Sequence, residues 1–136
     1  MPTPAKAQAV NINDLKRFSK DARINQLVLN AKGLVTRMNC YEPGQLTPKH
    51  MHPDHDEVIF CIEGRGAAKF DDSEPVPLTP GTIVNLPAGQ AHWLEAAPDS
   101  RMVVVYWAHA NYTSVRMHGQ SGYSEVRMPG EQPPSA

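Results

Sequence analysis

The chain has few cysteines, almost no net charge and no long apolar run, and each shortage excludes a class of protein. A net charge of -1 and a pI near 6.6 leave no basic surface for nucleic acid and no polybasic segment for a membrane. The apolar runs are shorter than the roughly 20 residues that a transmembrane helix needs. The first residues, MPTPAKAQAV, lack the charged region and apolar core of a secretion signal. We therefore expect a cytoplasmic protein with neither a nucleic acid nor a membrane as partner.

The 2 cysteines, Cys40 and Cys61, each fall in a segment that we expect to be a strand. The two strands could be neighbours in a sheet. Because cytosolic thiols stay reduced, we expect both side chains to pack as small apolar groups. A catalytic thiol or a cysteine-derived cofactor is the alternative, which we do not favour.

Proline and glycine are abundant instead, with 13 and 9 residues respectively. They divide the sequence into short segments, a pattern typical of an all-β protein rather than a helical one. A length of 136 residues fits a single domain that buries a hydrophobic core. The sequence therefore predicts one all-β domain.

Two stretches combine histidine, glutamate, glycine and proline at fixed spacings. The first, GQLTPKHMHPDHDEVIFCIEG, has the form G-x5-H-x-H-x4-E-x6-G and begins at Gly44. The second, GTIVNLPAGQAH, has the form G-x5-P-x-G-x2-H and begins at Gly81. Each residue type occurs at a few per cent, so accidental agreement at all nine positions has a probability below about 10⁻⁹. Three neutral imidazoles and one carboxylate form a ligand set for a divalent transition metal.

Both stretches resemble the paired motifs of the cupin superfamily, whose members are small antiparallel β-barrels of jelly-roll type. The resemblance implies one divalent transition metal per chain. We favour iron(II) because of the reaction hypothesis given below, with manganese, nickel or zinc as alternatives. The resemblance also implies the ligands His50, His52, Glu57 and His92. In the family the second motif usually continues with x3-N, where this chain has Ala96. That asparagine is not a usual ligand, so the departure weakens a closer subfamily match and leaves the metal site intact.

The residues support the same site without the family. His50 and His52 lie two positions apart, so in a strand both side chains point to one face. Residues 53–56 turn the chain, and Glu57 then opens the run EVIFCI, which reads as a strand. A carboxylate that points into a barrel needs a metal or a cation as partner. The alternative is a core in which the histidines only form hydrogen bonds, and the full match in spacing argues against it.

The motifs place the barrel at residues 21–110, between an N-terminal arm at 1–20 and a C-terminal extension at 111–136. In the arm, NINDLKRFSKDA is expected to form a short helix or an irregular cover, with Asn13 as a candidate helix cap. In the extension, PGEQPPSA is expected to be disordered. Within the barrel, FDDSEPVPL reads as a hairpin whose tip lies in water.

Five residues are expected to line a largely apolar substrate pocket inside the barrel: Ile59, Cys61, Leu94, Tyr106 and Trp107. Tyr106 and Trp107 occupy opposite faces of the closing strand, so one of them faces inward and the other faces a second layer or a partner. An apolar pocket with few positive groups suits a small molecule that chelates the metal through adjacent oxygens.

Other polar residues admit both a functional role and a simpler one. Arg37, Asn39 and Tyr41 alternate on one face and could bind a substrate carboxylate, although an outward polar face is the more common arrangement. His55 lies in the turn between the ligands, where a solvated side chain is a simpler expectation than a proton shuttle. An exposed or packing role is also expected of two later histidines, His109 and His118.

The sequence constrains the function less closely than the fold. Four protein ligands leave two positions of an octahedral ion for a chelating substrate, or for one substrate atom and dioxygen. The leading hypothesis is an iron(II) dioxygenase that acts on a small chelating enol, ketone or acid. One alternative is a non-oxidative isomerase, decarboxylase or lyase, and another is a non-catalytic module that binds or senses a small ligand.

We also expect a homodimer, in which the N-terminal arm or the segment from Asn111 covers a sheet edge that would otherwise be exposed. The resemblance implies the same assembly, because cupins are commonly dimers.

Overall fold

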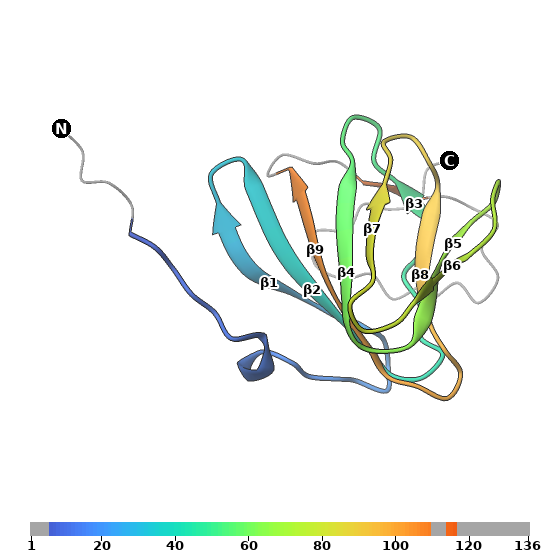
Figure 1. The fold of residues 1–136 in the computed structure, drawn as a ribbon, viewed down its shortest axis with the longest axis horizontal. Coiled ribbons are helices and arrows are strands. Elements are labelled where there is room, and N and C mark those ends of the chain that lie inside the picture. Colours follow the sequence, from blue (N-terminus) through green and yellow to red (C-terminus); the bar gives the residue numbers. More distant parts are fainter. Residues whose placement is uncertain (1–5, 110–113, 117–136) are drawn as a thin grey trace.

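Two antiparallel five-stranded sheets face each other and enclose the core (Figure 1). The structure is a computed structural model that describes residues 6–109 and 114–116. In order across the sheet, the first contains β1 (Ile24–Ala31), β2 (Leu34–Tyr41), β9 (Met102–His109), β4 (Glu57–Gly64) and β7 (Ile83–Leu86). The second contains β10 (Val115–Arg116), β3 (His50–Met51), β8 (His92–Ala96), β5 (Gly66–Phe70) and β6 (Val76–Leu78). The all-β jelly-roll prediction is confirmed.

Side chains of the closing strand alternate between two buried clusters. Met102, Val104 and Tyr106 belong to the inner cluster, which fills the space between the sheets. Val103 and Val105 belong to an outer cluster on the opposite face of the first sheet. Because both faces of β9 are covered, the strand is apolar almost throughout.

The N-terminal segment provides the cover for the outer cluster. Ile12, Leu15 and Phe18 pack against it, and the segment runs along the outside of the first sheet in Figure 1. Its only helical part among the described residues is the single 3-10 turn η1 (Ile12–Asp14). The prediction that Asn13 caps this helix is wrong. The cap is Asn11, whose side chain accepts a hydrogen bond of 2.9 Å from the backbone N–H of Asn13.

The same cover explains a second correction, on β2. Met38 and Cys40 lie in the outer cluster, so alternation turns Asn39 and Tyr41 toward the barrel interior. Asn39 is only 4% exposed and Tyr41 is fully buried. The expectation of an outward polar face for this set is therefore wrong, because the outer face of β2 is occupied by apolar packing against the N-terminal segment.

Other features of the sequence fall where they were expected. Both cysteines are free and buried, Cys40 in the outer cluster and Cys61 in the inner one. Strands β5 and β6 form the expected hairpin, and residues 71–75 at its tip are exposed. The domain boundaries near residues 20 and 110 stay predictions, and both PGEQPPSA and His118 lie outside the described residues. No helix in the described part of the chain is long and apolar enough to span a membrane.

Candidate metal centre

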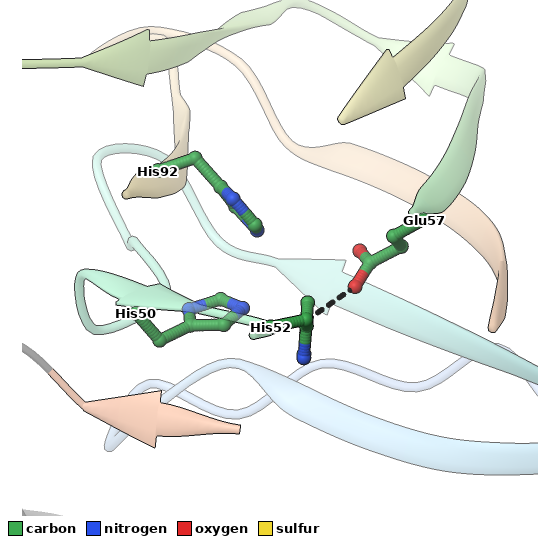
Figure 2. Close-up of side chains that lie close together, drawn as sticks. All are labelled: His50, His52, Glu57 and His92. Atoms are coloured by element: carbon green, nitrogen blue, oxygen red, sulfur yellow. Dashed lines mark ion pairs between the residues drawn. The ribbon is translucent and has the colours of Figure 1, made fainter. Parts of the chain in front are cut away.

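Four side chains from separate strands and loops converge at one end of the barrel (Figure 2). His50 on β3 and His92 on β8 are cross-strand partners in the second sheet. Glu57 begins β4 in the first sheet, and His52 lies in the loop that leads to it. One potential ligand atom from each of the four lies within 4.8 Å of the others. The structure therefore brings together the whole set that the motifs predict.

Backbone carbonyls orient two of the imidazoles. The Nδ1 atom of His50 lies 2.7 Å from the carbonyl oxygen of Pro48, and Nδ1 of His92 lies 3.1 Å from that of Gln90. Since a carbonyl only accepts, each Nδ1 carries the proton, which leaves the Nε2 lone pair for a ligand. The Nε2 atom of His92 is buried and has no hydrogen-bond partner among the described residues. A bound metal ion would satisfy this atom.

Burial keeps these imidazoles in the form that binds metals. The pKa of His50 lies well below its usual value, chiefly because burial disfavours the charged ring and also because His92 and His52 are nearby. Burial lowers the pKa of His92 as well, and the Glu57 carboxylate opposes that effect in part. Neutral rings are the ligand form, so protons compete weakly with a metal at this site.

Glu57 completes the cluster with a buried carboxylate. Its Oε2 atom lies 2.7 Å from Nε2 of His52, and both side chains are almost inaccessible to solvent. Ligand atoms about 2.1 Å from one ion lie at most about 4.2 Å apart, so the observed cluster needs only a small contraction to hold one. The four residues fit a divalent transition metal in their chemistry and their spacing.

Two links hold the second motif against the first. The N–H of Gly89 donates a 2.9 Å hydrogen bond to the carbonyl oxygen of His52. Asp56 accepts a 2.9 Å bond from the N–H of Ala88 and a 3.1 Å bond from the side chain of Asn85. These two hydrogen bonds, that of Ala88 first, lower the pKa of Asp56. The loop before His92 is thereby fastened to the turn that carries the other ligands.

The residues proposed for a substrate pocket divide between the two clusters. Ile59, Cys61, Leu94 and Tyr106 are buried in the inner cluster. Trp107 packs on the outer cluster instead, so a pocket role does not fit it, because alternation along β9 turns it away from the interior. A role of the other four in substrate binding stays a prediction.

The histidine expected in a solvated turn is packed. The ring of His55 stacks on that of His109, with centroids 4.6 Å apart and planes inclined by 8°. His109 thus has the packing role expected of it, and His55 is half-buried rather than free in water.

Polar residues that the sequence reading missed also reach the interior. Arg23, directly before β1, is 7% exposed, and its positive charge acts to lower the pKa of both His50 and Tyr41. Burial outweighs this effect at Tyr41 and raises the pKa of its hydroxyl. The side-chain amide of Asn25 donates to Asn39. One positive group therefore reaches the interior near β1. Ile24 packs on the outer cluster, so alternation turns both of its neighbours inward.

Comparisons with known proteins agree with this geometry. The family profile described as Cupin domain matches residues 37–109, which is more than half of the chain. An L-ectoine synthase from Aliivibrio fischeri (strain MJ11) is 30% identical over 83 residues, which cover 60% of this chain and 65% of the relative. The chain thus matches slightly less than two thirds of the length of that relative.

Solved structures share the fold at lower identity. A Klebsiella pneumoniae protein with a double-stranded beta-helix domain superposes with a TM-score of 0.76 at 20% identity, covering 85% of this chain and 96% of that one. The polyketide cyclase RemF from Streptomyces resistomycificus gives a TM-score of 0.72 at 19% identity, covering 86% and 89%. The profile match and the shared fold show that this chain belongs to the cupin superfamily.

Proposed function

We propose that this protein is a metal-dependent enzyme that catalyses a non-oxidative reaction, of the lyase or cyclase class, on a small chelating acid or carbonyl compound. The observation that carries the proposal is the buried cluster of three histidines and one glutamate at the end of the barrel. A divalent metal held there would supply Lewis acidity to a substrate oxygen. The names of two similar proteins, a synthase and a cyclase, support the non-oxidative class.

The chain's own residues contribute orientation and the exclusion of water. Carbonyl groups fix the ring orientation of His50 and His92, so their Nε2 atoms are set before a metal or substrate arrives. Ile59, Leu86 and Leu94 bury the interior beside the ligands. A dry site of this kind strengthens electrostatic interactions with a bound substrate and protects a reactive species from hydrolysis.

An iron(II) dioxygenase is the second candidate. It is favoured by the donor set itself, since histidine and carboxylate ligands suit iron as well as manganese, nickel or zinc. Both candidates use the same four residues, so the presence or absence of oxygen is the variable that separates them.

The test is turnover of a substrate panel by anaerobically metal-loaded protein. Small diketones, enols and hydroxy acids are incubated with each metal form, and products are followed by NMR before and after oxygen is admitted. The proposal expects turnover that is equal with and without oxygen and that stops when a chelator removes the metal. Turnover that starts only with oxygen, with matching oxygen consumption, would assign the protein to the dioxygenases instead.

Two variants separate the site from the rest of the barrel. Glu57→Gln keeps the shape of the side chain but removes the charge, so it should weaken metal binding and lower turnover. Glu63→Gln, on the same strand but paired with Lys16 in a half-exposed ion pair, should leave both unchanged. Tight ligand binding by every metal form without any turnover would identify a binding module.

A further inference from the structure

A group of polar side chains lies on the inner face of the first sheet, apart from the metal ligands. Asn25 on β1, Asn39 on β2 and Tyr106 on β9 belong to it. Tyr106 pairs in register with Ile59 of β4, two residues beyond Glu57 on the same strand. Two residues correspond to about 7 Å along a strand, so Tyr106 lies within reach of a small molecule bound at the metal. The side chain of Asn25 connects Asn39 to Tyr106 by hydrogen bonds.

Asn25 is the donor in both hydrogen bonds that link the three side chains of this group. The Nδ2 atom of Asn25 donates to Oδ1 of Asn39 and to the hydroxyl oxygen of Tyr106, at 2.8 Å in each case. The acceptor atoms of Asn39 and Tyr106 are thus engaged inside the group. What Asn39 offers a ligand is therefore its side-chain N–H groups, which are donors.

Arg23 adds a positive charge to the same face of the first sheet. In the β1–β2 pairing Ile24 lies opposite Cys40, which places Arg23 beside Tyr41 on the inner face. The side chain is more than nine-tenths buried. It lies near enough to both Tyr41 and His50 for its charge to act on them. A guanidinium in a buried setting recognises carboxylates through paired N–H donors.

We propose that Arg23 and Asn39 bind a carboxylate of the substrate whose other end binds the metal, and that Asn25 and Tyr106 hold Asn39 in position. The substrate class is then a small acid with two functional ends, one that chelates and one that is anionic. A divalent ion with a single carboxylate ligand and a guanidinium nearby favours an anionic ligand over a neutral one. This inference rests on the proposed function for the metal-bound end of the substrate.

Two pairs of 2-oxo acids test this assignment. 2-Oxoglutarate and 2-oxopentanoate have the same chain length and the same chelating group, and only the former has a distal carboxylate. 2-Oxoadipate and 2-oxohexanoate repeat the comparison with a longer chain. Binding to nickel-loaded full-length protein is measured by calorimetry. In at least one pair, the diacid should bind at least about tenfold more tightly than the monoacid. This difference in affinity corresponds to one charge-assisted contact.

The Arg23→Gln variant should lose this preference while its metal content and its affinity for the monoacid stay unchanged. Asn39→Asp provides a second variant should the first fail to fold, because the carboxylate still accepts from Asn25 but repels an anion. It should weaken diacid binding and leave monoacid binding unchanged. Arg65→Gln, at an exposed ion pair with Asp99, is the matched control and should bind both acids as the unchanged protein does.

Three results would overturn the inference. One is equal affinity for diacid and monoacid in both pairs, including no measurable binding of either. Another is a diacid preference that persists in Arg23→Gln or in Asn39→Asp. The third is an equal loss for both acids in the variants, which would assign a structural role to these residues. Loss of metal from the unchanged protein would instead count against the proposed function, and elemental analysis of each sample separates the two failures.

Discussion

The backbone N–H of Gly89 donates a hydrogen bond of 2.9 Å to the carbonyl oxygen of His52. This bond joins the second motif to the first at a ligand. Asp56 adds another link, because its carboxylate accepts from the N–H of Ala88. The metal site is therefore held by bonds between loops as well as by its strands.

Removal of the Asp56 link should weaken metal binding although no ligand is removed. In Asp56→Ala the loop before His92 loses an anchor, and we expect metal affinity to fall about tenfold, as for other residues that orient ligands. Competition with a chromogenic chelator measures the affinity. Asp54→Ala, an exposed neighbour in the same turn, is the control. Equal affinities of the two variants would show that the loop needs no such anchor.

Two glycines with the same backbone conformation should respond very differently to alanine. Gly64 has φ 77° and a Cβ there would overlap the backbone carbonyl of Arg101, whereas Gly33 has φ 79° and open space around it. We expect Gly33→Ala to cost about 1 kcal/mol from its backbone conformation. Gly64→Ala should cost more than about 4 kcal/mol, or prevent folding, because the backbone of a neighbouring strand must move. Urea denaturation compares them, and similar midpoints would contradict the packing at Gly64.

The metal site was more predictable from the sequence than the rest of the interior. The spacing of the motifs carries all four ligands, although His52 lies in the loop just after β3 and not in the strand that the alternation argument assumed. No comparable pattern marks Asn39. On β2 both alternating sets are buried, so alternation alone does not tell which set faces inward. The answer depends on Phe18 and its neighbours, which cover the outer face from a distant segment.

Trp107 shows the same limit on β9. The sequence places Tyr106 and Trp107 on opposite faces, and either ring has enough apolar surface for a buried position. Only the register with β4, in which Tyr106 lies opposite Ile59, settles which ring faces the metal ligands. Long-range pairing of this kind is not encoded in any local pattern.

The two cysteines should be unreactive in the folded protein. Burial raises the pKa of both the Cys40 and the Cys61 thiol, although a hydrogen bond with the Arg17 backbone lessens the effect at Cys40. A raised pKa keeps the reactive thiolate scarce at pH 8, and its population should grow only above the ordinary thiol range. Ellman's reagent should therefore react slowly with native protein and rapidly with both thiols in denaturant. Rapid reaction of the native protein at pH 8 would contradict the burial.

We expect a homodimer that covers the edge of the first sheet. Strand β1 lies at that edge, and Leu27 and Leu34 of the β1–β2 hairpin are 49% and 45% exposed. The Leu27→Arg substitution should raise the dissociation constant of the dimer at least about tenfold over that of the unchanged protein, because it places a charge at an apolar contact. Ile83→Arg, on the opposite edge strand β7, is the control. Light scattering that gives a monomer at micromolar concentration for the unchanged protein would refute the assembly.

The most direct test of the account is elemental analysis of the unchanged protein and of the three variants His50→Ala, His52→Ala and His92→Ala, after loading and removal of excess metal. We predict about one divalent transition metal ion per chain in the unchanged protein, as the ligand set implies. Each variant should lose most of its metal while circular dichroism still shows the β-structure, and His109→Ala should keep its metal. Full occupancy in all three ligand variants, or an unchanged protein that holds no metal after loading, would contradict the assignment of this site.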